Sequence, residues 1–222
     1  AAVRQFWWID THADNDLDLF VALRDRPNAM YRNDGGRFTD IAAPMGLADT
    51  RRSVGAIWFD YEEDGDLDLY VANQDGDANG LWRNDHGRFA DVAAQFGLTG
   101  AGRPVGIPTN GSVRVCTADV DGDGRLDVVS ANYGKNGVFL NKPGKFDDVS
   151  EAWGIALDSH YDTCALEDYD NDGKIDLFMN GTWTGAVSKR SYLFRNTGHS
   201  FEQVTPATLT LVDGRPATQT RE

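Results

Sequence analysis

Acidic side chains recur at a fixed spacing in four short stretches of this chain. The stretches begin at Asp10, Asp60, Asp119 and Asp168, and when aligned they read D-x-[DEH]-x-D-[GN]-x-x-D. Carboxylates at positions 1, 3, 5 and 9 can converge on one point only if the backbone curls tightly. Position 6 always holds a residue that tolerates left-handed backbone: Asn15, Gly65, Gly124 or Gly173. Converging oxygen ligands indicate a hard cation, and Ca²⁺ tolerates irregular geometry better than Mg²⁺ does.

We therefore predict up to four calcium sites, because a bound cation removes the repulsion between neighbouring carboxylates. The proposed ligands are Asp10, His12, Asp14 and Asp18; Asp60, Glu62, Asp64 and Asp68; Asp119, Asp121, Asp123 and Asp127; and Asp168, Asp170, Asp172 and Asp176. Four such ions would bring the net charge from −14 to −6, an ordinary value for a small domain. The first site is expected to be the weakest, because His12 replaces an oxygen ligand and Asn15 replaces glycine.

An EF-hand is the alternative interpretation of these stretches. Its loop needs a bidentate Glu at position 12 and a helix on either side. Position 12 is instead occupied by Val21, Val71, Ser130 and Met179, and the residues that follow have the composition of strands. The EF-hand interpretation therefore fails.

The acidic stretches are 50, 59 and 49 residues apart, and each lies at the same place in a longer repeat. One apolar run precedes each stretch and three runs follow it, separated by Gly, Asn and Asp. Four strands per repeat at this period predict an all-β fold, a β-propeller built of four-stranded blades. The first strand is apolar at consecutive positions, as in residues 6–9, so we expect it to be covered on both faces near the propeller axis.

These features resemble the FG-GAP/VCBS repeat family, which includes the calcium-loop blades of the integrin α-subunit propeller. The resemblance rests on the D-x-D-x-D-G-x-x-D loops followed by "LDL", and on repeat ends such as "YRNDGGRFTD", which are typical of the bacterial branch associated with ASPIC/UnbV segments. It implies a propeller with calcium in the loop between the first two strands, on the face opposite the usual ligand surface. Family propellers usually have seven blades.

The chain shows four blades, which we place at about residues 3–48, 51–98, 112–157 and 161–209, with residues 210–222 as a linker to a missing next blade. We expect a fragment, or one chain of a larger, about seven-bladed ring. An open array would expose Trp7, Trp8 and their counterparts. Exposed apolar area of that size normally finds a partner, so we expect self-association or another chain that completes the propeller.

Composition excludes several classes of partner. A net charge of −14 argues against nucleic acid, which requires clustered Lys and Arg. No stretch approaches the roughly 20 apolar residues of a membrane span. Cys116 and Cys164 lie three and four residues ahead of their acidic stretches, an offset that points them to opposite sides of equivalent strands. We therefore expect two buried thiols rather than a disulfide.

Two segments interrupt the repeat and are the places to look for a ligand site: residues 98–112 and 180–191. In a propeller both connections emerge on one face, in adjacent blades. We expect the ligand-binding residues to be Trp183, Lys189, Arg190, Tyr133 and Arg103. A tryptophan with nearby hydrogen-bond donors suits a sugar ring or a peptide.

The sequence favours a non-catalytic module for binding, adhesion or scaffolding, outside the cytoplasm, in an extracellular or periplasmic setting. Extracellular calcium modules work at about 10⁻⁴–10⁻³ M ion, a concentration that the cytosol lacks. No nucleophile motif or phosphate-binding glycine loop is present in the sequence. The alternative is a lectin, or the propeller domain of a secreted carbohydrate-active enzyme such as a polysaccharide lyase or dehydratase.

Overall fold

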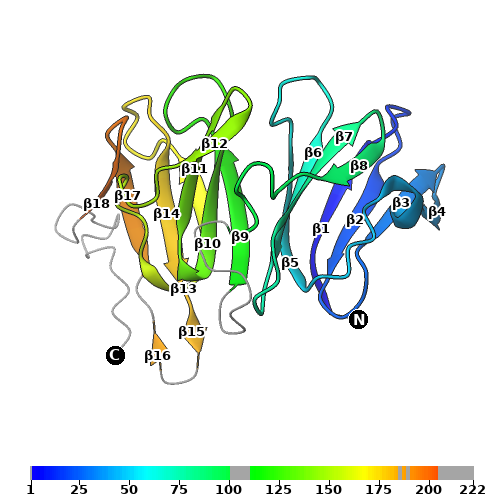
Figure 1. The fold of residues 1–222 in the computed structure, drawn as a ribbon, viewed down its shortest axis with the longest axis horizontal. Helices are drawn as coiled ribbons and strands as arrows, with labels where there is room; N and C mark the ends of the chain where they lie inside the picture. Colours follow the sequence, from blue (N-terminus) through cyan, green and yellow to red (C-terminus); the bar gives the residue numbers. More distant parts are fainter. Residues whose placement is uncertain (1, 101–110, 185–186, 189–190, 205–222) are drawn as a thin grey trace, which may run out of the picture.

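The fold consists of antiparallel sheets, and within each four-stranded unit the strands pair in chain order (Figure 1). The computed structural model describes residues 2–100, 111–184, 187–188 and 191–204. The first sheet has the order β1-β2-β3-β4, with the strands β1 (Val3–Ile9), β2 (Asp18–Leu23), β3 (Ala29–Asp34) and β4 (Arg37–Asp40). The short helix α1 (Ala42–Met45) follows it. The second sheet repeats this order, with β5 (Ser53–Phe59), β6 (Asp68–Asn73), β7 (Gly80–Asp85) and β8 (Arg88–Asp91).

The rest of the described chain forms one larger sheet and a small hairpin. The larger sheet contains β9 (Gly111–Ala118), β10 (Asp127–Lys135), β11 (Gly137–Lys142), β12 (Lys145–Asp148), β13 (Asp158–Glu167), β14 (Asp176–Gly181), β17 (Tyr192–Asn196) and β18 (Phe201–Gln203). It combines two copies of the four-stranded pattern, because the end of β10 pairs with the start of β13 at Tyr133 and His160. The hairpin joins β15 (Trp183–Thr184) to β16 (Val187–Ser188). The predicted all-β fold of four-stranded antiparallel sheets is confirmed.

Strand register places every acidic stretch at the same end of its sheet. The last residue of each first strand pairs with the aspartate at position 9, as Ile9 pairs with Asp18 and Ala118 pairs with Asp127. The acidic loops therefore lie along the upper edge in Figure 1, whereas β1 starts at the lower edge. The hairpin β15–β16 projects from that lower edge as well.

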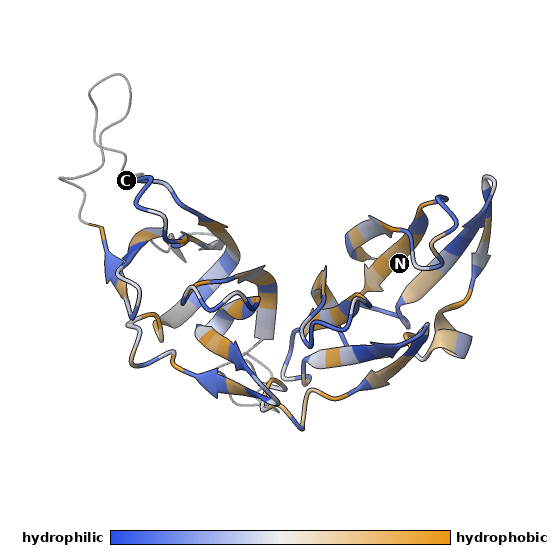
Figure 2. Ribbon diagram, turned by 90° about the horizontal axis from the view of Figure 1, so that it is seen from above, coloured by the Kyte–Doolittle hydropathy of each residue, from blue (hydrophilic) through white to orange (hydrophobic). Residues whose placement is uncertain are grey.

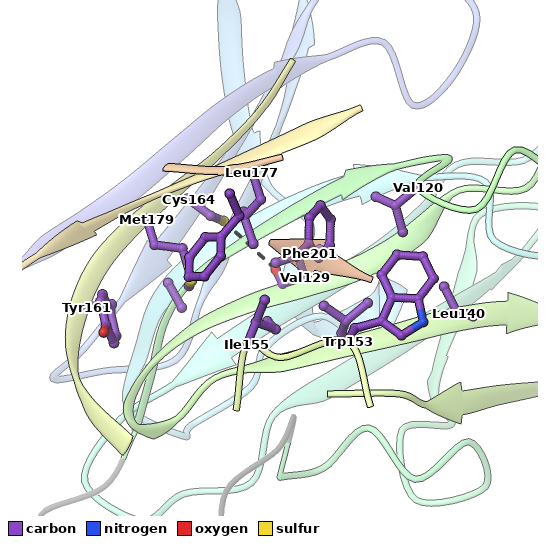
Figure 3. Packing of buried hydrophobic residues seen from close by; sticks show 13 residues of the cluster. Val120, Val129, Leu140, Trp153, Ile155, Tyr161, Cys164, Leu177, Met179 and Phe201 are labelled. Atoms are coloured by element: carbon purple, nitrogen blue, oxygen red, sulfur yellow. Dashed lines mark hydrogen bonds between the residues drawn. The ribbon is translucent and has the colours of Figure 1, made fainter. Parts of the chain in front are cut away.

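Hydrophobic clusters fill the spaces between successive four-stranded units. Phe20 and Met30 of the first sheet pack with Leu69 and Val71 of the second. Tyr70, on the other face of β6, packs in a separate cluster that includes residues of β9, β10 and β11. The largest cluster joins the last two units and contains Val129, Leu140, Trp153, Leu177, Met179 and Phe201 (Figure 3). Strands of the middle units thus bury both faces, and each fully buried side chain of this size contributes about 1.5–3 kcal/mol.

The outer face of the first sheet remains uncovered, and the sheets fan out in an open arc (Figure 2). Phe6 and Trp8 are 58% and 49% exposed, so the prediction that the first strand is covered on both faces is wrong for β1. Alternation along the strand explains the difference. Trp7 points the other way, toward the second sheet, where its indole Nε1 donates a hydrogen bond to the carbonyl oxygen of Ala56 over 2.7 Å.

Cys116 and Cys164 form a disulfide between β9 and β13, with their Cα atoms 6.1 Å apart. The prediction of two free thiols is therefore wrong. The offset between the two positions does send their side chains to opposite faces of equivalent strands. Neighbouring units stack face to face, however, so opposite faces are the two that meet.

Two further findings concern the chain as a whole. The predicted linker, residues 210–222, lies outside the described residues. Within the described part of the chain, no helix has the length and apolar character needed to cross a membrane.

Candidate metal centres

The backbone of each acidic loop curls around the aspartate at position 1. The residue at position 6 is left-handed in every loop, with φ of 69° at Asn15, 94° at Gly65, 92° at Gly124 and 87° at Gly173. The turn aims this residue's amide at the first aspartate. Gly124 N donates to Asp119 Oδ2 over 2.8 Å, and the amide of Asp123 donates to Oδ1 over 3.0 Å. Equivalent pairs of bonds hold Asp10, Asp60 and Asp168.

The aspartate at position 9 is buried and joins the loop to the third strand. Asp18, Asp68 and Asp127 are fully buried, and Asp176 is 1% exposed. In the third repeat, Asp127 Oδ2 accepts a bond of 2.8 Å from the amide of Val120, and Oδ1 accepts one of 2.8 Å from the amide of Asn141. The other three loops repeat both bonds. In the second, third and fourth loops, two amides are few neutral donors for a buried carboxylate, so its charge lacks compensation.

Burial raises the pKa of Asp68 and of Asp127 from 3.8 to about 7, and neighbouring acids of the same loops add to the rise. At Asp18 burial also acts to raise the pKa, but hydrogen bonds from Thr11, Asn33 and His12 outweigh it and the pKa is lowered. His12 Nδ1 lies 2.9 Å from Asp18 Oδ2, and the hydroxyl of Thr11 donates to the same oxygen. The first loop therefore satisfies its buried carboxylate internally.

Two aspartate triads have the geometry of a cation site. In each of the groups Asp119, Asp121, Asp127 and Asp168, Asp170, Asp176, one oxygen per residue lies within 4.8 Å of the others. Ca²⁺ binds oxygen at about 2.3–2.6 Å, so two ligands across one ion stand about 5 Å apart or less. The triads are thus compact enough for one ion each, and their all-oxygen donor set suits a hard cation. Among the described residues, the loops that begin at Asp10 and Asp60 form no equivalent triad.

Basic side chains contact the two triads from the third strand. Lys142 Nζ donates to Asp121 and lies 2.6 Å from Asp123 Oδ2. Arg195 lies 3.3 Å from Asp170 and 3.6 Å from Asp172. The predicted ligands at position 5, Asp123 and Asp172, thus stand outside the triads and beside a cationic side chain. A metal ion would compete with these side chains for the same carboxylates.

Neighbouring loops are linked by asparagine side chains. Asn141 Nδ2 donates to the carbonyl oxygen of Tyr61 in the second loop, and Asn196 Nδ2 donates to that of Val120 in the third, both over 2.7 Å. Arg125 in the third loop also pairs with Glu63 in the second. The equivalent Asn84 donates instead to Leu67 of its own repeat, over 3.1 Å. The sequence analysis did not identify these bridges, although asparagine recurs at this position in every repeat.

Each acidic loop, together with the strand that follows it, recurs as one unit, and comparison with known families identifies that unit. The family model described as FG-GAP-like repeat matches residues 10–71, 60–130 and 119–179, so every match runs from one acidic loop into the second strand of the next repeat. The chain belongs to the FG-GAP-like repeat family. Its assignment to the branch associated with ASPIC/UnbV segments stays a prediction.

Three solved structures are similar to this chain at low identity. An Agrocybe aegerita lectin that specifically recognises non-reducing terminal N-acetylglucosamine is 20% identical, with a TM-score of 0.50 over 91% of this FG-GAP chain and 52% of the lectin. The V. cholerae biofilm matrix protein Bap1 is 13% identical, with a TM-score of 0.46 over 89% of this chain and 29% of its own. The Photorhabdus luminescens Tc holotoxin pore is 22% identical, with a TM-score of 0.42 over 89% and 9%. This chain thus spans about half the length of the lectin. Comparison with curated proteins gives no match.

Of the five predicted ligand-binding residues, the structure describes Tyr133 and Trp183, which lie at the edge of the FG-GAP repeats opposite the acidic loops. Tyr133, near the end of β10, lines a cavity of about 390 Å³. Trp183 belongs to β15 at the same edge. Arg103, Lys189 and Arg190 lie outside the described residues. Of the five predicted residues, the structure therefore places one in a cavity.

Proposed function

We propose that this chain is a calcium-stabilised, non-catalytic binding module, with cations held by its acidic loops at one edge of the sheets and a ligand bound at the other. The observation that carries the proposal is the pair of aspartate triads, each of which includes an aspartate that is buried with only backbone amides as hydrogen-bond donors. In the third and fourth repeats, Asp119, Asp121, Asp127, Asp168, Asp170 and Asp176 would hold the ions. The cations supply the positive charge that these buried carboxylates lack.

Calcium would act on stability rather than on chemistry. An ion that binds only the folded state adds about 2.7 kcal/mol per site at a hundredfold excess over Kd. Thermal unfolding with and without a chelator tests this directly: we expect the melting temperature to fall substantially when calcium is removed. Re-addition of calcium should restore it, and magnesium should restore less. A melting temperature that changes neither with chelator nor with added calcium would contradict the proposal.

We further infer an extracellular or periplasmic location. The disulfide between Cys116 and Cys164 supports it, because such bonds persist in oxidising compartments and are rare in the cytosol. Calcium sites of moderate affinity also fill only where the ion is abundant. The thiol content of protein taken directly from its natural compartment tests the inference. Fully reduced cysteines would contradict it.

The uncovered face of the first sheet supports a partner, either another copy of this chain or a different chain that continues the propeller. Phe6, Trp8 and Phe38 are all exposed there, and the rings of Trp8 and Phe38 lie 6.1 Å apart. We expect concentration-dependent association in light scattering, and we expect Trp8→Ser to reduce it. If wild type and Trp8→Ser are both monomers at high concentration, this part of the proposal is contradicted.

A further inference from the structure

The cavity beside Tyr133 lies where the inner strands of all four repeats begin. Arg4, Val54, Val113 and Asp162 line it. Each of these residues stands six positions before the first aspartate of its acidic loop, so the four occupy one equivalent place in the repeat. The cavity is therefore enclosed by the repeats jointly, at the edge opposite the acidic loops.

A second repeat position completes the lining. Arg24, Gln74 and Tyr133 each follow the first aspartate of their acidic loop by 14 residues, near the end of the second strand, and all three line the cavity. The aspartates that build the acidic loops are the same in every repeat at positions 1, 5 and 9, whereas the cavity positions vary, with Arg, Val, Val and Asp at the first and Arg, Gln and Tyr at the second. The fold does not dictate the cavity residues. The differences between repeats line the cavity with basic, acidic, apolar and aromatic side chains, which suits one ligand in one orientation.

Hydrogen bonds fix part of the lining before any ligand arrives. Arg24 donates to Gln74 Oε1 over 2.6 Å and also pairs with Asp75. The hydroxyl of Tyr133 donates to Asp162 Oδ1 over 2.8 Å, and its ring stacks on His160 with centroids 4.5 Å apart. Such preorganisation lowers the entropy cost of binding.

One basic and one acidic side chain of the cavity remain available to a ligand. Among the residues that the structure describes, Arg4 has no acidic partner and Asp162 has no basic one. With the pair of Arg24 and Asp75, the cavity holds two guanidinium and two carboxylate groups, so it carries no net charge. Val54 and Val113 add an apolar wall between the polar groups. A ligand that fits must donate to a carboxylate, accept from a guanidinium and present some C–H surface.

We propose that this axial cavity binds a neutral saccharide ring. Each sugar hydroxyl both donates and accepts a hydrogen bond, so one ring can serve Asp162 and Arg4 together while its C–H face meets the two valines. The volume lies in the range of about 300–1,000 Å³ that ligand pockets occupy. A polyanionic ligand is disfavoured by the two carboxylates and by the net charge of −14. This inference rests on the proposed binding function and names the ligand class of its ligand-binding edge.

The test is ligand-observed NMR on the whole chain in millimolar calcium. The probes are methyl glycosides of glucose, galactose, mannose and N-acetylglucosamine, with glucuronate as the charged comparison. We compare wild type with Arg4→Ala and Asp162→Asn, and use Arg37→Ala, which removes an exposed arginine of β4, as the matched control. Each cavity variant should weaken binding of the preferred glycoside about tenfold, as expected for one lost charge-assisted hydrogen bond. Arg37→Ala should leave binding unchanged.

Three results would overturn the inference: no neutral glycoside binds, glucuronate binds more tightly than every neutral probe, or both cavity variants bind as wild type does. A calcium-dependent melting temperature, measured on the same samples, shows that each variant is folded. If that dependence is intact while sugar binding is absent, the saccharide inference fails and the calcium-stabilised module stands. If the calcium dependence is absent while glycosides bind at Arg4 and Asp162, calcium stabilisation fails and the saccharide inference stands.

Discussion

The first two repeats and the last two are built from the same units but are held together differently. Between the first two sheets the contact is made by packed side chains: Trp58 lies edge-on to Phe20 of the first sheet and to Phe89 of its own sheet, with both pairs of ring centroids 5.7 Å apart. The last two repeats share one continuous sheet, a disulfide and the hydrogen bond from Asn196 of β17 to the carbonyl oxygen of Val120 in the third acidic loop. They also contain both aspartate triads. The comparison teaches that one repeat frame can be stabilised by side-chain packing and the ion pair of Arg24 and Asp75 in one half, and by a shared sheet and a disulfide in the other.

The largest loss of unfolding free energy is expected from Trp58→Ala, in the half formed by the first two repeats. Removing a large ring from between two others should cost about 3 kcal/mol, because a cavity remains at the contact of the two sheets. Urea unfolding measures the change. The indole Nε1 of Trp58 is buried and has no hydrogen-bond partner among the residues that the structure describes, so Trp58→Phe is the matched control and should cost much less. Equal losses for both variants would show that the ring contacts do not stabilise this half.

The disulfide is expected to act on the other half. Replacing Cys116 and Cys164 together by alanine should lower the free energy of unfolding by about 2–4 kcal/mol, the usual contribution of a disulfide. Hydrogen exchange should show faster opening of β9 and β13 and little change in β1 to β4. Uniform loss of protection across all the sheets would contradict a division into two differently stabilised halves.

The asparagine side chains test the link between the two halves, because Asn141 joins the third repeat to the second whereas Asn84 bonds to Leu67 of its own repeat. Asn141→Ala should cost about 1–3 kcal/mol, because it leaves the carbonyl oxygen of Tyr61 without its buried donor. Asn84→Ala removes the exposed bond of 3.1 Å to Leu67 and the bond of 2.7 Å that Asn84 Oδ1 accepts from the amide of Gly87; both stay within one repeat and neither carbonyl nor amide is fully buried, so it should cost less. Chemical denaturation of both variants in excess calcium measures the difference. A larger loss for Asn84→Ala would contradict the assigned role of the bridge.

Acidity should have a smaller effect on the calcium-free protein. Because burial raises the pKa of Asp68 and Asp127 from 3.8 to about 7, the folded state binds more protons than the unfolded state between these values. In chelator, the free energy of unfolding should therefore fall as the pH rises from about 4 to about 7. Asp127→Asn should flatten that slope. If the free energy of unfolding instead rises with pH in chelator, the charges of these carboxylates are compensated in the folded state.

The internal repeat made most of the fold and much of the candidate site predictable from sequence. Position 6 of each loop is left-handed as predicted, because Gly65, Gly124 and Gly173 lack the steric penalty there and Asn15 tolerates this conformation. The partner of Cys116 could not be found in this way, because a comparison within one strand pattern does not show how two sheets face each other. The exposure of Phe6 was missed for the same reason: whether a strand face is covered depends on the neighbouring sheet.

The cavity was only partly accessible to sequence reasoning. Tyr133 was selected because it lies near two segments that interrupt the repeat, whereas Arg4 and Asp162 lie inside regular strands and attracted no attention. A signal was nevertheless present. Aligned repeats show Arg, Val, Val and Asp at one position of a strand that otherwise keeps its apolar character, and such variation inside a repeated frame marks a place that the scaffold leaves open.

Calcium titration of chelator-treated protein by calorimetry tests the central claim most directly, with Asp127→Ala and Asp18→Ala compared with wild type. Both aspartates are fully buried and accept the same two backbone bonds, but only Asp127 belongs to a triad. We predict at least two bound calcium ions in wild type and one fewer in Asp127→Ala. In Asp18→Ala both triads should still bind their ions. Wild-type protein that binds no calcium, or that binds it equally well without Asp127, would contradict the account.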